Sequence, residues 1–98
     1  MAVLLPLAVR TGMRDIGEHL AAWRKLQGLS VAALSERCGV SASTITRVEK
    51  GKGASLDNVL IIARGLGIME SVTEAFDPWN HERGRALLQS HLPQRIRD

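Results

Sequence analysis

The stretch from Val31 to Lys50 constrains the fold more than any other part of this 98-residue chain. Its sequence, VAALSERCGVSASTITRVEK, divides at Gly39 into two segments with helical periodicity. A connection this short makes two helices cross at a steep angle. That crossing requires a small residue between the helices and a residue in the turn that tolerates positive φ. Ser35 and Gly39 meet these requirements. The apolar residues expected to point into the angle are Leu34, Cys38, Val40, Ile45 and Val48.

The flanking sequence is also helical in pattern, and no run has the alternation of a long strand. We predict helices over about 15–27, 31–38, 42–50, 56–66, 69–76 and 80–91, from apolar periodicity, caps and breakers. Ser30, Ser41 and Ser55 are the expected N-caps, and Gly28, Gly39 and Gly67 are the expected terminators. The buried stripe of the fourth helix is expected to contain Leu56, Val59, Leu60, Ala63 and Leu66.

Composition supports an all-α fold, because 45% of the residues are hydrophobic while only 3% are aromatic. A core made mostly of Leu, Ile, Val and Ala favours packed helices over a sheet sandwich. We divide the chain into a leader at 1–13, a helical domain at 14–67 and a C-terminal helical extension at 68–98. The leader is expected to be either an extended start or an arm that orders on a partner.

The net charge of +3 is compatible with a polyanionic partner but does not require one. Cys38 is the single cysteine, so no internal disulfide forms, and we interpret it as a small buried hydrophobe. The apolar run from Ala2 to Val9 lacks a preceding basic region, is interrupted by Pro6 and is too short to span a bilayer. We therefore expect a cytoplasmic protein without a membrane segment.

The region from Ile16 to Leu66 resembles the DNA-binding domain of the Cro/C1-type (xenobiotic-response-element, XRE) regulators. The phrase LAAWRKLQGLS is similar to the opening helix of that family, and SLDNVLIIARGLGI is similar to its fourth helix. VSASTITRVEKG resembles the recognition helix and the glycine that follows it. The resemblance implies a five-helix, lambda repressor-like domain whose third helix enters the major groove. It also implies a homodimer on double-stranded DNA, with half-sites roughly 34 Å apart or a multiple of that.

The resemblance also assigns residues to the DNA. The base-facing positions are Ala42, Ser43, Thr46 and Arg47, and the phosphate-facing positions are Ser41, Thr44, Lys50 and Lys52. Arginine can bind guanine O6 and N7 together, so Arg47 is the strongest candidate for reading a base. The alternatives for Arg47 are a phosphate contact or a solvated surface charge. The short Ala42 and Ser43 predict sparse direct readout and more dependence on DNA shape.

Two further family features concern the support of the recognition helix. Arg24 and Glu49 resemble a buried ion pair that ties the first helix to the end of the third, although they could also be two solvated charges. Many family members carry a glutamine after the cap at Ser30, where it braces the recognition helix and touches a phosphate. Val31 occupies that position here and can do neither, which puts a phosphate contact at this position in doubt.

The C-terminal third contains too many large apolar side chains for a free tail. They are Phe76, Trp79, Leu87, Leu88 and Leu92, and we expect them to pack on the domain, a second protomer or another protein. The segment DPWNHERGRALLQSHLPQRIRD is similar to the tails of regulators paired with HipA-type kinase toxins. We therefore expect an autoregulating repressor, with the antitoxin of such a toxin as a narrower hypothesis. The alternative is an interaction module of the same fold that no longer binds DNA specifically.

An enzyme is not indicated. His19, His81 and His91 lack ligand spacing with one another or with the cysteine, so we expect neither a metal nor a cofactor. The Gly-Lys-Gly run at 51–53 is too short and misplaced for a phosphate-binding loop, and no Ser/His/Asp arrangement has local support.

Overall fold

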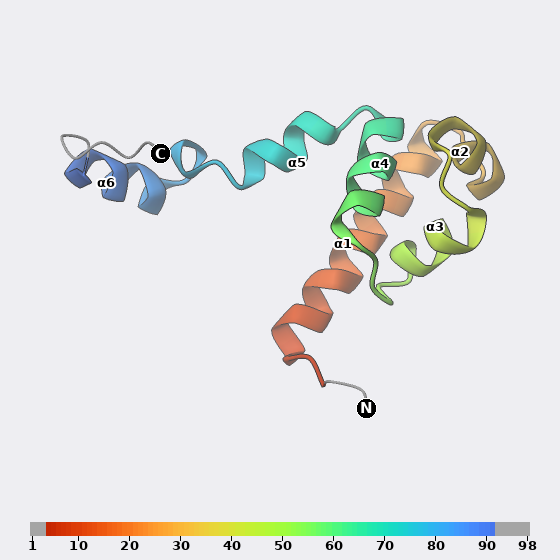
Figure 1. Cartoon of the computed structure of the whole chain (residues 1–98), viewed down its shortest axis with the longest axis horizontal. Helices are drawn as coiled ribbons and strands as arrows, with labels where there is room; N and C mark the ends of the chain where they lie inside the picture. The colour runs from red at the N-terminus through yellow and green to blue at the C-terminus, as the bar shows by residue number, and fades with distance from the viewer. Residues whose placement is uncertain (1–3, 92–98) are drawn as a thin grey trace.

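The computed structural model describes residues 4–91, and over that range the chain contains helices and no β-strand (Figure 1). The prediction of an all-α fold is therefore confirmed. The elements in chain order are α1 (Leu7–Leu26), α2 (Val31–Cys38), α3 (Ala42–Glu49), α4 (Leu56–Leu66), α5 (Met69–Ala75), the 3-10 helix η1 (Pro78–Asn80) and α6 (Glu82–His91). No helix in residues 4–91 is long and apolar enough to cross a membrane.

Helices α1 to α4 enclose a single hydrophobic core. Leu34 of α2 and Ile45 of α3 are completely buried, and Ile62 of α4 is almost so. Burial of one such side chain contributes about 1.5–3 kcal/mol relative to its exposure. The remaining core side chains are Leu20, Val40, Val48, Ala63 and Leu66. The apolar set predicted for the angle between α2 and α3 lies in this core, with Cys38 half-buried at its edge.

The connections of the domain follow the predicted caps. Ser30, Ser41 and Ser55 each accept a hydrogen bond from the backbone N–H three residues later, at 3.0, 3.2 and 3.4 Å. Gly39, at the end of α2, has a φ of 78°, which a residue with a Cβ rarely adopts. Next to it the Ser35 hydroxyl donates to the Val40 carbonyl oxygen at 2.7 Å. The turn between α2 and α3 is thus fixed by the residues that the sequence indicated.

The prediction that the first helix starts at Asp15 is wrong, because α1 begins at Leu7. Pro6 precedes it with a φ of −55°, and its carbonyl oxygen accepts from the N–H groups of Val9 and Arg10. Proline at a helix start is favourable because its φ is already close to helical. Residues 7–13 are therefore helical, while the division of the chain at 13/14 stays a prediction. The pattern gave no sign of these two turns because most of their apolar side chains, such as Leu7 and Val9, are exposed.

Smaller differences concern the ends of elements. Leu56 is 69% exposed at the start of α4, so it does not belong to the predicted buried stripe. The buried residues of α4 are Ile62, Ala63 and Leu66, and none of them lies in its first turn. The predicted last helix begins at Glu82, because Pro78 and the two residues after it form a separate 3-10 turn. Helices α3 and α5 each end one residue earlier than predicted.

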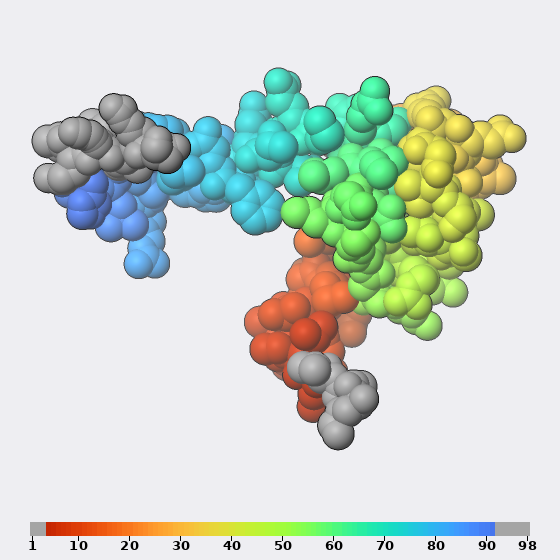
Figure 2. All heavy atoms as spheres, in the orientation of Figure 1, coloured from red at the N-terminus to blue at the C-terminus, as the bar shows by residue number. Residues whose placement is uncertain are grey.

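Helices α1–α4 form the helical body of the protein. Beyond α4 the chain leaves this body as an arm, which we define as residues 68–91. Figures 1 and 2 show α5, η1 and α6 extending away from α1–α4. Helix α6 packs mainly against η1, where Gly84 lies so close to the Pro78 carbonyl that a Cβ would not fit. Phe76 is 81% exposed, and Trp79 and Leu87 are about half exposed. The arm therefore does not bury these side chains on its own domain, while Leu92 lies outside the described residues.

Candidate DNA-binding interface

Helix α3 has an inner face that belongs to the core and an outer face that is accessible. Ile45 and Val48 are buried on the inner side. Because a helix turns 100° per residue, residues one or two positions away from these point outward. Accordingly Ser43 and Arg47 are exposed and Thr46 is half-buried, while Ala42 is exposed at the first position of the helix. All four predicted base-facing side chains thus lie on α3 outside the core.

The N-terminus of α3 carries a cluster of three hydroxyl groups. The Ser41 hydroxyl accepts from the Thr44 N–H and donates to the Thr44 hydroxyl at 2.9 Å. It also lies 3.2 Å from the Ser43 hydroxyl. The first backbone N–H groups of a helix have no intrahelical partner and carry a partial positive charge, so an oxyanion is favoured there. The cluster has the chemistry of a phosphate contact, and the contact predicted for Ser41 and Thr44 stays a prediction.

The basic residues lie at the other end of α3. Arg47 donates one guanidinium N–H to the Lys52 carbonyl oxygen at 3.0 Å, so its side chain runs along the loop that follows the helix. The Lys52 N–H in turn donates to the Arg47 carbonyl at 3.0 Å. Lys50 and Lys52 are both exposed. The guanidinium has five N–H donors, and within residues 4–91 only this one has a protein acceptor, which leaves donors for a phosphate or a base.

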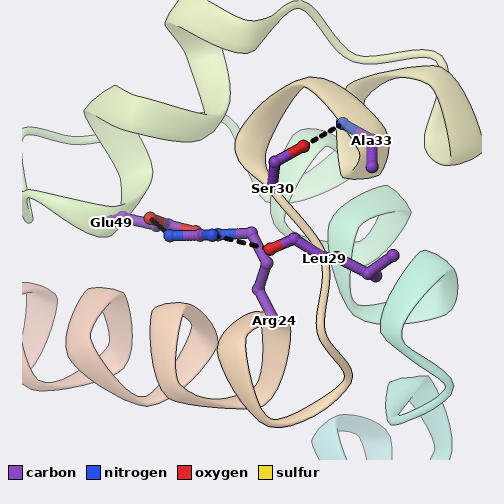
Figure 3. A network of polar contacts seen from close by, with 5 residues as sticks. All are labelled: Arg24, Leu29, Ser30, Ala33 and Glu49. Carbon is purple, nitrogen blue, oxygen red and sulfur yellow. Dashed lines mark hydrogen bonds and ion pairs between the residues drawn. The ribbon is translucent and has the colours of Figure 1, made fainter.

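The ion pair predicted from the family resemblance is present and fixes the end of α3 (Figure 3). Arg24 donates Nε to one carboxylate oxygen of Glu49 at 2.7 Å and Nη2 to the other at 3.0 Å. Its third nitrogen, Nη1, donates to the Leu29 carbonyl at 2.8 Å. The side chains are only 11% and 13% exposed. The hydrogen bonding that Arg24 donates to Glu49 raises the pKa of Arg24. The contacts of its guanidinium tie α1, the turn before α2 and α3 together.

Val31 takes part in packing. Its side chain is half-buried against the hydrophobic core, at the first position of α2. A valine side chain has no hydrogen-bonding group. With Val31 in place of the glutamine of the family pattern, this position makes apolar contacts and no polar side-chain contact. The side chain of this residue contributes to the position of α2 and has no group for a polar contact with DNA.

Sequence reasoning missed the N-terminal half of α1 as a neighbour of this interface. A Cβ on Gly51 would lie 2.7 Å from the Arg14 Cα, and one on Gly53 would lie 3.5 Å from the end of the Met13 side chain. The loop after α3 therefore rests directly on α1. The available signal was the spacing of Arg10, Arg14 and Gly17, which places all three on one helix face.

An all-α body in which a positive-φ glycine joins two short helices, the second with an accessible face, defines a helix-turn-helix DNA-binding domain. The helix-turn-helix family model matches residues 20–69, just over half of the chain, and the chain belongs to this family. The match supports the Cro/C1-type (XRE) class, so the protein is a DNA-binding regulator of the XRE type. This family is one of DNA-binding domains and not of enzymes. No curated protein and no solved structure matches the chain.

Proposed function

We propose that this protein is an autoregulating repressor that reads the major groove as a homodimer through α3. The observation that carries the proposal is the division of α3 into a buried face and an accessible face that ends in basic residues. In the proposed complex Arg47 contacts a guanine or a phosphate, and Ala42, Ser43 and Thr46 face the base edges. The hydroxyls of Ser41 and Thr44 and the ammonium groups of Lys50 and Lys52 contact phosphates.

The test is fluorescence anisotropy with the DNA upstream of the protein's own gene and a scrambled duplex. We expect the upstream duplex to bind at least about a hundredfold more tightly, as specific regulators do. Arg47→Ala should remove most of this preference. Arg64→Ala is the matched control, because Arg64 is an exposed arginine in the last turn of α4. Equal binding of both duplexes by the unmodified protein would contradict the proposal.

The arm supports the proposed dimer. Phe76, Trp79 and Leu87 are large apolar groups that the body does not cover, and aromatic side chains are enriched in the energetic centres of interfaces. A second copy of the arm is the proposed cover in the free protein. Sedimentation equilibrium should then give a dimer that a Phe76→Ser/Trp79→Ser variant converts to a monomer. A monomeric unmodified protein at micromolar concentration would refute this part.

A HipA-type kinase toxin is the proposed partner in the narrower hypothesis, on the basis of the similar C-terminal segment.

The arm also favours the second candidate function, an interaction module that does not read DNA. The two functions differ in their response to salt. DNA binding weakens steeply as salt rises because counterions are released, whereas binding through apolar side chains does not.

A further inference from the structure

The N-terminal half of α1, residues 7–16, projects past the end of α3; we call this helical segment the rod. Gly17 is the point of contact, because a Cβ there would lie 2.4 Å from the Val48 carbonyl oxygen and 2.6 Å from that of Glu49. The helix begins ten residues earlier, at Leu7, which corresponds to about 15 Å of helix. Figures 1 and 2 show this segment leaving the body on its own, next to the loop that follows α3.

Two arginines lie on the face of this rod that continues toward the loop. Arg10 and Arg14 are four residues apart, and Gly17 is three residues further, so the three share one helix face. Gly17 is packed on the end of α3 and the Arg14 backbone is packed on Gly51. The direction of that face is therefore fixed by contacts. Arg10 lies one turn further out on the same face and is exposed, as is Arg14.

Within residues 4–91 no ion pair neutralises the cations of this region. In the part of the chain that the structure describes, the only ion pair is that between Arg24 and Glu49. Glu18 follows Arg14 by one turn but forms no such pair. The two arginines of α1 thus join the three basic residues at the end of α3 and in its loop, which are Arg47, Lys50 and Lys52.

We propose that Arg10 and Arg14 form a second contact with the DNA backbone, on phosphates that flank the site read by α3. The inference rests on the proposed function, because it takes the accessible face of α3 as the side that meets DNA. Five cations along two joined elements have no ion-pair partner within residues 4–91. A partner that complements them is a polyanion with regularly spaced charges, and duplex DNA has this property. The contact is to phosphates, so it adds affinity and fixes register without reading the flanking sequence.

The test is the salt dependence of binding by an Arg10→Gln/Arg14→Gln variant. Glutamine matches arginine in helix propensity, so α1 is retained. Each phosphate contact contributes about 0.9 to the slope of log K against log salt, so losing two should make the slope shallower by about 1.8 over about 50–200 mM salt. Lys25→Gln/Arg64→Gln is the matched control, because it removes two exposed charges from the last turns of α1 and α4. The control should leave the slope unchanged within about 0.5.

Duplex length gives a second readout. Base pairs of arbitrary sequence added beside the site should tighten binding of the unmodified protein and leave the Arg10→Gln/Arg14→Gln variant unaffected. In one outcome the protein prefers the upstream duplex through Arg47 while the Arg10→Gln/Arg14→Gln variant keeps the salt slope of the unmodified protein. This result overturns the inference and leaves the proposed function standing. If the unmodified protein shows no preference for the upstream DNA, and the variant has a shallower salt slope than the unmodified protein on the scrambled duplex, the inference is supported and specific reading is overturned. Equal slopes for the variant and its charge-matched control also overturn the inference.

Discussion

Gly17 is the residue at which the packing of α1 on α3 is most sensitive to a single methyl group. An alanine Cβ would lie 2.4 and 2.6 Å from the carbonyl oxygens of Val48 and Glu49, and 2.8 Å from the Glu49 carbonyl carbon. The closest approach is about 1 Å short of ordinary van der Waals contact. These neighbours are backbone atoms, which no rotamer change can move. The two helices must separate, which also strains the ion pair between Arg24 and Glu49.

The magnitude of Gly17→Ala follows from two opposing terms. Alanine inside a helix is favoured over glycine by about 1 kcal/mol. Overpacking typically costs about 1–3 kcal/mol, and we take the upper end because backbone must move. The net loss is therefore about 2 kcal/mol in the free energy of unfolding. In a domain of this size that lowers the Tm by about 8–16 °C.

Gly12→Ala is the matched control on the same helix. A Cβ at Gly12 would have no atom within 4 Å, so only the propensity gain of about 1 kcal/mol remains. We expect the Tm to rise for Gly12→Ala and to fall for Gly17→Ala in melts followed by far-ultraviolet circular dichroism. A Gly17→Ala protein as stable as the unmodified one would refute the packing argument. No gain from Gly12→Ala would refute the start of α1 at Leu7.

Three other predictions test individual contacts. Glu49→Gln leaves the charge of Arg24 buried without its counter-ion, so urea unfolding should show a loss of about 3–5 kcal/mol; a loss below about 1 kcal/mol would indicate a solvated pair. Ser30→Ala removes the cap of α2 and should cost about 1 kcal/mol, whereas Ser30→Asp should restore most of it. The hydrogen bonds from the Ser55 hydroxyl and the next backbone N–H lower the pKa of Asp57. The resulting stabilisation is present above the pKa of an unfolded aspartate and is lost as the pH falls through the lowered value. NMR titration should place the midpoint below that of an unstructured peptide.

The helix-turn-helix could be predicted because its requirements are local. Ser35, Gly39 and the apolar positions around them lie within 20 residues, and each has a single steric reason. The first two turns of α1 could not be predicted in this way. Most of their apolar residues, such as Leu7 at 68% exposure, face solvent, so these turns carry no periodic pattern. The helix there depends on Pro6 and on continuity with the packed part at Gly17.

The interface divides in the same way. The pair of Arg24 and Glu49, 25 residues apart, could be anticipated only from the family resemblance, since no spacing rule joins distant charges. The shared helix face of Arg10, Arg14 and Gly17 was the only local signal for the closeness of Arg14 to the loop after α3, and it does not identify the loop as the contact. This closeness depends on the tertiary contact of two glycines, Gly17 and Gly51, with backbone atoms of the opposite element. Close backbone contacts that depend on the lack of a side chain, as at Gly17 and Gly51, are the hardest to foresee from a sequence.

The chemistry of α3 bears on how a specific complex would form. Ala42 and Ser43 offer a methyl group and one hydroxyl to the groove, and the hydroxyl already lies 3.2 Å from that of Ser41. In the proposed complex direct reading depends mainly on Arg47, and a bidentate base contact that draws its side chain away from the Lys52 carbonyl loses that hydrogen bond. The lost hydrogen bond, at a net value of about 1 kcal/mol, is small against the roughly 1–3 kcal/mol of discrimination from a bidentate guanine contact. In the proposed complex the remaining specificity comes from the shape of DNA, which the proposed phosphate contacts at both ends of α3 would follow.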